Sequence, residues 1–230
     1  MRHNSAIYII ALTPHFNREA VIQFNKFDKE YSSYLHSSLM LNHYELLKNF
    51  KSILPVVYFI DEKDKDFLPV EFHDSKIIFR ESGKPNLITN ILREKYFSAT
   101  NKNLIILSNS IGFTSAIIKK IFDLLLVEDN VVVIGKAYNN KVSFIGFNSN
   151  QLEIFQGINW CKPDFDSLLA KACKGENYIY VLENFMIMND AEDFKLLYNE
   201  LSKKESLSYC SHSMHERFTN LFIEYKDLLK

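Results

Sequence analysis

The segment from residue 103 to residue 148 constrains the fold of this chain more than any other. It contains, in order, a strand, a helix and a strand at residues 104–108, 113–127 and 131–136. Short, wholly apolar strands joined through an amphipathic helix are typical of a crossover unit in a sheet that is covered on both faces. Asn139 and Asn140 then form a turn into a third strand at 141–147, which predicts a hairpin.

Strands and helices alternate through the rest of the chain. Further strands are predicted at residues 6–12, 55–60, 76–79 and 178–182. Further helices are predicted at residues 31–51, 86–97, 165–173, 189–201 and 212–229. We therefore expect an α/β fold, a three-layer sandwich with a mostly parallel central sheet. We expect one α/β domain at residues 1–205, with a C-terminal helix within residues 206–230 packed on it.

Composition and charge argue against several classes of protein. Hydrophobic residues make up 47% of the 230 residues, which favours a globular chain over a disordered one. The formal net charge is −1 and no polybasic stripe is present, so we expect no nucleic-acid partner. No apolar run approaches the roughly 20 residues of a membrane helix, and the run after Ser5 is too short for a signal peptide.

Cysteine and aromatic content add two expectations. Three cysteines, odd in number and far apart, do not make a disulfide framework, and a cytoplasmic location is the simplest account. With 19 Phe and 12 Tyr, the fold has the material for an exposed apolar patch and hence for a homo-oligomer.

Common catalytic and phosphate-binding motifs are absent from the sequence. No Walker A loop, G-x-G-x-x-G loop, G-x-S-x-G elbow or H-E-x-x-H helix occurs. Cys210, His212 and His215 form a C-x-H-x-x-H pattern, but structural zinc usually has four ligands, and an ordinary helix N-terminus is favoured over a metal site. Arg80 and Lys84 flank a turn at a strand's carboxyl end, where ligands bind in open α/β sheets, although a solvated loop is favoured.

Four segments carry a resemblance to a known family. Residues 104–114 (LIILSNSIGFT) resemble a strand followed by I-G-S-D-C-P-x-L-T, and 132–147 (VVIGKAYNNKVSFIGF) resemble V-V-L-G-P-A-x-D-G-G-Y-Y-L-I-G. Residues 155–168 (FQGINWCKPDFDSL) resemble L-F-x-G-I-P-W-S-T-P-x-V-L, the most specific match, and 189–194 (NDAEDF) resemble D-T-P-E-D-L. The chain thus resembles bacterial glycosyltransferase-like proteins often labelled "transferase 1", associated with radical-SAM and selenodomain genes. That family is similar to nucleotide-sugar and nucleotidyl transferases of the GT-A type. The resemblance spans about residues 7–201 and is clearest from Leu104 onward.

The resemblance implies a nucleotide-sugar site with a divalent metal, Mg²⁺ or Mn²⁺, on the diphosphate. Asn109 and Asn189 stand where the family has metal-binding aspartates, and an amide offers a cation an oxygen without charge. Asn139 stands in place of the D-G-G motif. Asp190, Glu192 and Asp193 are the nearest substitutes, although carboxylates there also suit a helix N-terminus.

The same resemblance points to contacts for the nucleotide. The family has a basic, Gly-containing loop after the first strand, and this chain retains there only His15, Arg18 and Lys26 as candidate phosphate contacts, without the glycine. Trp160 either lines the pocket or anchors the core, and a lone Trp more often does the latter. The candidate cofactor-binding residues are therefore His15, Arg18, Asn109, Asn139 and Trp160.

Two functions remain open. The first is a glycosyltransferase or nucleotidyltransferase-like enzyme that uses a nucleotide sugar and a metal at a degenerate site. The alternative is a catalytically inactive scaffold of the same fold, without a cofactor, that binds a partner or another ligand.

Overall fold

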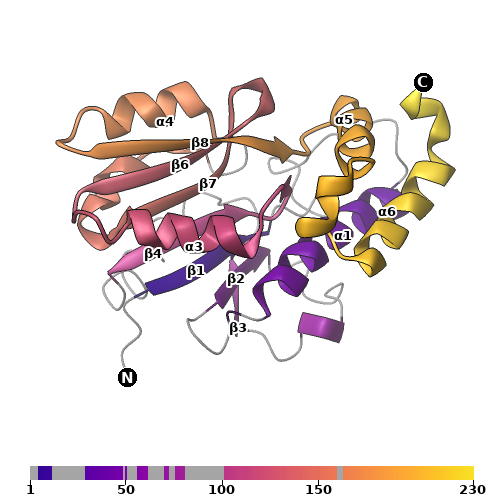
Figure 1. Cartoon of the computed structure of the whole chain (residues 1–230), viewed down its shortest axis with the longest axis horizontal. Coiled ribbons are helices and arrows are strands. Elements are labelled where there is room, and N and C mark those ends of the chain that lie inside the picture. The colour runs from indigo at the N-terminus through magenta and orange to yellow at the C-terminus, as the bar shows by residue number, and fades with distance from the viewer. Residues whose placement is uncertain are drawn as a thin grey trace.

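The computed structural model describes residues 5–11, 29–48, 50, 56–61, 70–72, 76–80, 101–159 and 163–230. Eight strands in these residues form one sheet in the order β3-β2-β1-β4-β7-β6-β8-β5 (Figure 1). The strands are β1 (Ser5–Ile10), β2 (Val56–Asp61), β3 (Lys76–Arg80), β4 (Lys102–Leu107), β5 (Ser110–Ile111), β6 (Val131–Ala137), β7 (Lys141–Asn148) and β8 (Tyr178–Ile187).

The described residues also contain five α-helices and several short 3₁₀ segments. The α-helices are α1 (Lys29–Leu47), α3 (Ser115–Leu124), α4 (Phe165–Ala172), α5 (Glu192–Leu201) and α6 (His212–Glu224). The 3₁₀ segments are η2 (Val70–Phe72), η4 (Tyr138–Asn140), η5 (Ser149–Phe155), η6 (Lys204–Ser208) and η7 (Lys226–Leu229). None of the helices among these residues is both long and apolar enough to cross a membrane.

The sheet is mostly parallel, as the sequence predicts. β1 pairs in parallel with β2 and β4, β2 with β3, and β6 with β8. β7 is inserted antiparallel between β4 and β6, and the short β5 pairs antiparallel with the end of β8. Six strands therefore end at the same edge of the sheet, which we call the carboxyl edge. Ligands of open α/β sheets bind at such an edge.

The strongest sequence prediction, the unit at residues 103–148, is confirmed. β4, α3 and β6 form the crossover, and β6 and β7 form the hairpin through η4. Asn140 in that turn has φ = 59°, a left-handed conformation that asparagine tolerates better than most residues. α3 packs on β7, where a Cβ added at Gly146 would lie 2.8 Å from Cγ2 of Ile121. α4 packs near β6, where Lys136 Nζ lies 4.9 Å from the centroid of the Phe165 ring, and the expected three-layer α/β sandwich is confirmed.

Local capping explains where several helices begin. The Asp164 carboxylate accepts a hydrogen bond from the Ser167 N–H at 2.8 Å, as predicted for the start of α4. Thr114 caps α3 by accepting from the Ile117 N–H at 3.1 Å. α3 starts later than predicted because Gly112, with φ = 104°, turns the chain and sends Phe113 into the core. The helix predicted at residues 86–97 lies outside the described residues.

The C-terminal segment packs on α1. The Asn42 amide donates to the Tyr209 carbonyl at 3.0 Å, and the Arg217 guanidinium lies 4.6 Å from the Tyr34 ring centroid. The predicted helix at residues 212–229 is divided, because α6 ends at Glu224 and η7 follows.

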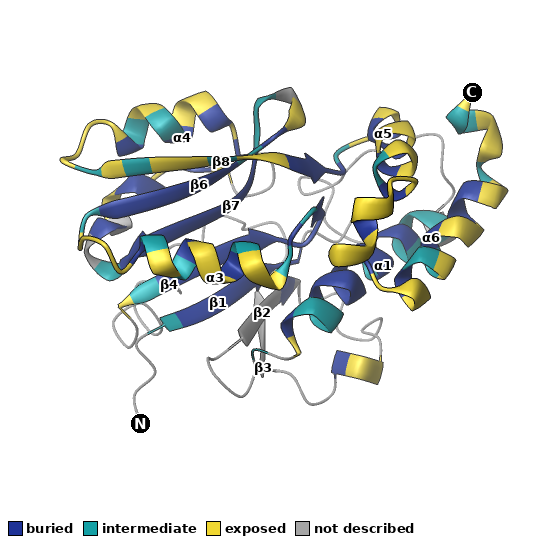
Figure 2. Ribbon diagram, in the orientation of Figure 1, coloured by how far each residue is buried: buried dark blue, intermediate teal, exposed yellow. Residues whose placement is uncertain are grey.

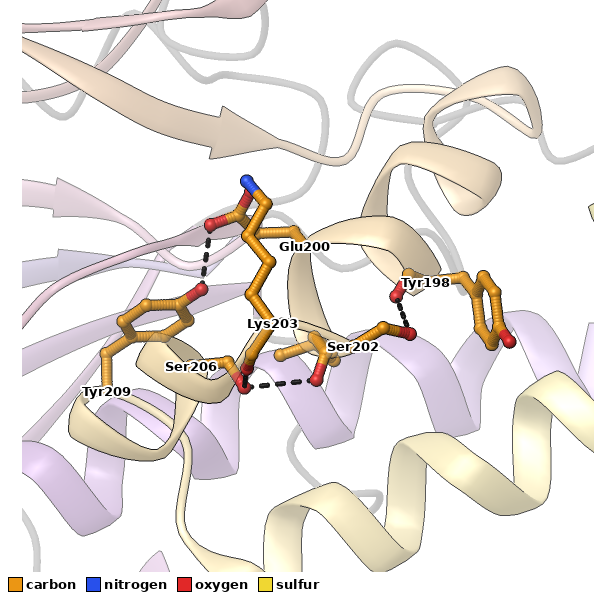
Figure 3. A network of polar contacts seen from close by, with 7 residues as sticks. Tyr198, Glu200, Ser202, Lys203, Ser206 and Tyr209 are labelled. Atoms are coloured by element: carbon orange, nitrogen blue, oxygen red, sulfur yellow. Dashed lines mark hydrogen bonds and ion pairs between the residues drawn. The ribbon is translucent and has the colours of Figure 1, made fainter.

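A polar network joins α5 to η6 (Figure 3). The Tyr209 hydroxyl donates to Glu200 Oε1 at 2.8 Å, and Lys203 Nζ lies 2.5 Å from Glu200 Oε2. The Ser206 hydroxyl donates to the Lys203 carbonyl at 2.6 Å. These contacts fix the direction in which the chain leaves α5 towards α6.

Candidate functional site

The turn that follows β4 lies at the carboxyl edge and carries Asn109. β5 begins directly after this residue and pairs with β8 in the register Ser110–Ile187. The pairing places Asn109 beside Met188: the Asn109 amide donates to the Met188 carbonyl at 2.9 Å, and the Met188 N–H donates to the Asn109 carbonyl at 2.9 Å. Asn109 and Asn189 are thus brought close together, since Asn189 is the next residue in the chain.

The Asn109 side chain is buried and only half satisfied. Its exposed fraction is 1%, and its Oδ1 has no hydrogen-bond partner in the described structure. Most buried polar atoms in folded proteins have a partner, so an orphaned acceptor of this kind marks either strain or a ligand position. Because Asn109 is an amide, this unpaired Oδ1 carries no formal charge.

The carboxylates after β8 serve the start of α5. Asp193 accepts from the Asn189 N–H at 2.7 Å and from the Asp190 N–H at 3.3 Å. Asp190 in turn accepts from the Glu192 N–H at 2.9 Å and from the Asp193 N–H at 3.3 Å. This reciprocal pattern satisfies N–H groups that a helix start leaves without intrahelical partners. Burial raises the pKa of Asp193 above its ordinary value, against the lowering effect of these hydrogen bonds.

The described residues do not fit the divalent metal that the resemblance implies. No group of three or more His, Cys, Asp or Glu side chains in the described residues is placed to hold a metal ion. Asn109 offers one uncharged oxygen, while the Asp193 carboxylate is directed at backbone N–H groups. Mg²⁺ and Mn²⁺ sites are usually built on carboxylates, so we assign no step to a metal here.

The C-x-H-x-x-H pattern belongs to a helix start. The Ser211 hydroxyl caps α6 by accepting from the Met214 N–H at 3.3 Å. Cys210 is buried, and burial raises the pKa of its thiol to about 12. The His215 ring pairs with the Ser206 hydroxyl at 3.0 Å. These residues hold the C-terminal segment in place.

His43 at the carboxyl edge was missed by the sequence analysis. It lies on α1, fully buried, with Nε2 at 2.8 Å from the Ser110 carbonyl oxygen and its ring 5.5 Å from that of Phe113. Because a carbonyl only accepts, Nε2 carries the proton and Nδ1, which has no partner in the described structure, is the free acceptor. Burial lowers the pKa of His43 to about 4, so the ring is neutral at pH 7. Its one sequence signal is its position next to Asn42 on a helix with an apolar face.

The other predicted site residues are placed less fully. Asn139 lies in η4 at the carboxyl end of β6, and its side chain is outside the description. Its neighbour Asn140 donates to an Asp166 carboxylate oxygen at 2.8 Å, which ties the hairpin to α4. The predicted residues outside the described parts of the chain are His15, Arg18, Lys26, Lys84 and Trp160.

No protein-family model and no curated protein sequence matches this chain. Solved structures do match. A "putative nucleotide-diphospho-sugar transferase" from Desulfovibrio desulfuricans G20 has a TM-score of 0.72 at 14% identity, over 96% of this chain and 98% of that chain. A cytidylyltransferase from Leptospira borgpetersenii serovar Hardjo-bovis has a TM-score of 0.54 at 13% identity, over 100% and 97%. The inositol-1-phosphate CTP transferase from T. maritima has a TM-score of 0.51 at 12% identity, over 96% and 97%.

These likenesses define the class of fold. The chain has the nucleotide-diphospho-sugar transferase-like fold, as the sequence resemblance implies. At identities of 12–14% they show the fold alone, since one fold hosts many activities.

Proposed function

We propose that this chain is a nucleotide-sugar-dependent glycosyltransferase-like or nucleotidyltransferase-like protein with a nucleotide site at the carboxyl edge of its sheet. The observation that carries the proposal is the likeness over 96% of the chain, at a TM-score of 0.72, to the protein from D. desulfuricans described above. Ligands of open α/β sheets bind beyond the carboxyl ends of the strands, and Asn109 and Asn189 lie there. The four sequence segments similar to the "transferase 1" family support the same class, and a cytoplasmic location is part of the proposal.

The chemistry at this site would be binding and orientation. In this proposal Arg18 supplies positive charge for a diphosphate and His15 a further phosphate contact, and the guanidinium of arginine matches phosphate oxygens with paired hydrogen bonds. Asn139 and Trp160 line the remainder of the site in this proposal. Because the described residues do not fit a divalent metal, nucleotide binding is expected to proceed without one held by Asn109 and Asn189.

A second function is favoured by one observation. The side-chain N–H of Asn109 and the carboxylate of Asp193 are both hydrogen-bonded to backbone groups of the fold itself, which is what a scaffold without catalysis needs. In this alternative the chain is a catalytically inactive relative that binds a partner or a different ligand.

Calorimetry and thermal shift with a panel of nucleotides and nucleotide sugars, each with and without Mn²⁺, separate these functions. Saturable binding that Arg18→Ala weakens at least tenfold, and that Mn²⁺ leaves unchanged, supports the proposal. The matched control is Lys119→Ala on the exposed side of α3, which should bind as the parent does. Absence of binding across the panel overturns the nucleotide site and favours the scaffold. Binding that requires Mn²⁺ contradicts the metal-free site.

A further inference from the structure

β8 has an open edge. Among the described residues, one side of this strand pairs with β6 from Tyr178 to Leu182 and again at Phe185, whereas the other pairs only at Met186 and Ile187, with β5. No strand in the described part of the chain pairs with the outer side of residues 178–185. Figure 2 shows exposed and half-buried residues along most of β8, in contrast to the buried strands next to it.

The open segment lacks the features that normally protect such an edge. It reads Tyr-Ile-Tyr-Val-Leu from Tyr178 to Leu182, without a charge or a proline. The exposed fractions are 59% for Tyr178, 38% for Tyr180 and 38% for Val181. Exposed strand edges in natural proteins are usually shielded by Lys, Pro, a bulge or a covering segment, because an apolar edge is a template for another strand. The bulge in β8 comes only after Leu182, at the register shift before Phe185.

The free hydrogen-bonding groups of this edge can be assigned. The Tyr178 N–H donates to the Asn130 carbonyl at 3.0 Å, towards β6. Backbone groups of successive residues in a strand point to opposite sides, so Tyr180 and Leu182 also face β6. The N–H and C=O groups of Ile179 and Val181 therefore face outward.

We infer that two copies of this chain pair antiparallel through β8, about a two-fold axis at Tyr180, so that one sheet runs through both copies. In this register Ile179 faces Val181 of the second copy, and the two exchange N–H···O=C bonds on each side of the axis. Tyr180 faces its own counterpart in a non-hydrogen-bonded pair, where side chains approach most closely. Every facing pair is aromatic or aliphatic, which is the favourable kind of cross-strand pair.

The sequence around the segment selects this register and this occupant. An axis at Val181 would set the Glu183 carboxylate opposite Ile179 and bring Asn184, with φ = 73°, into the ladder. An axis at Ile179 would draw in Glu176, which precedes the strand. Of these three registers, only the axis at Tyr180 pairs the uncharged residues 178–182 of one copy with residues 182–178 of the other. Two-fold dimers are also the commonest homo-oligomers. This inference is independent of the nucleotide site.

The test is the mass of the full chain in solution, by light scattering and sedimentation over a dilution series. The expected result is a particle of twice the 27.0 kDa chain mass at the highest concentrations. Val181→Pro removes an outward N–H and leaves the bonds to β6 intact, so this variant should keep its circular dichroism and run as a monomer. Ile223→Lys changes an equally apolar and more exposed side chain (65%) on α6 and should remain a dimer.

A charge exchange tests the axis itself. Tyr180→Lys and Tyr180→Glu each place like charges face to face and should each be monomeric, whereas an equimolar mixture should restore the doubled mass. A parent chain that is monomeric at every concentration overturns the inference. A dimer that survives Val181→Pro and both Tyr180 variants overturns it too, because the contact then lies elsewhere. If Val181→Pro fails to fold, the Tyr180 mixture decides: a mixture that stays monomeric refutes the two-fold axis.

Discussion

Asn109→Asp restores the acid that the resembled family carries at this position, and the structure predicts that it destabilises the fold. The Asn109 amide nitrogen lies 2.9 Å from the Met188 carbonyl oxygen in a site with 1% exposure. An aspartate in the same rotamer sets one oxygen against another there. When ionised it has no hydrogen to donate, and when protonated its O–H replaces the lost N–H. The cost must therefore depend on pH.

The magnitude follows from two contributions. Leaving a buried hydrogen-bonding group without its partner costs about 1–3 kcal/mol. Burial raises the pKa of an aspartate by up to about 3–5 units, and each unit between folded and unfolded states is worth about 1.4 kcal/mol. We expect a loss of about 1 kcal/mol at pH 4 and of about 3–5 kcal/mol at pH 7. The sign follows from linkage: the folded pKa lies above the unfolded one, so the protonated form favours folding and stability falls as pH rises between the two values.

Urea unfolding of the parent and the variant from pH 4 to pH 8 measures this difference, and the parent's own titrations cancel in it. Asn130→Asp is the matched control, because Asn130 also donates to a backbone carbonyl, that of Glu176, but at an exposed position. Its penalty should be small and nearly independent of pH. A pH-independent penalty for Asn109→Asp would refute the reasoning. So would recovery of its stability on adding Mn²⁺, because the aspartate would then complete a metal site.

Three further predictions rest on other contacts. Burial lowers the pKa of His43 to about 4, so the neutral ring stabilises the fold fully above pH 6.5. The free energy of unfolding should fall by about 3 kcal/mol as the pH is lowered from 6.5 to 4, and His43→Gln should flatten this part of the urea-unfolding profile. Gly135→Ala should cost about 3 kcal/mol or more in thermal unfolding, since its Cβ would lie 2.1 Å from ring carbons of Phe144, and a loss under 1 kcal/mol would show that the ring moves freely. Tyr209→Phe should cost about 1 kcal/mol through the lost bond to Glu200; a double-mutant cycle with Glu200→Gln should show coupling, and additivity would contradict the network in Figure 3.

Local signals in the sequence were sufficient for most of the fold. Uncharged apolar runs marked the central strands, and Asp164 marked the start of α4, because a cap depends only on residues three positions apart. The end of β8 was not predictable in this way. The strand continues past Leu182 through Asn184, whose left-handed backbone (φ = 73°) lies at the register shift between β8 and β6, and that shift depends on how β8 pairs with a strand distant in the sequence.

The candidate site shows the same division. Sequence similarity pointed to Asn109 and Asn189, and the structure pairs Asn109 with Met188, the residue directly before Asn189. Sequence similarity could not show that the Asn109 amide bonds to Met188, since that contact joins residues 79 positions apart and requires β5 to pair with β8. The role of His43 has the same origin: it depends on where α1 meets the turn after β4, which no local pattern records.

The amide at position 109 and the closure of β5 on β8 depend on one another. A carboxylate at this position would face the Met188 carbonyl at hydrogen-bond distance, and in a buried site such a pair of oxygens is tolerable only with a cation or a proton between them. Asparagine needs neither a cation nor a proton, because its side-chain N–H bonds directly to the Met188 carbonyl and so joins the turn after β4 to the end of β8. An asparagine in place of an aspartate also lacks the negative charge that would attract a metal. The uncharged amide of Asn109 therefore has two effects: its N–H joins the segments at the carboxyl edge of the sheet, and its lack of charge reduces the attraction of that edge for a divalent cation.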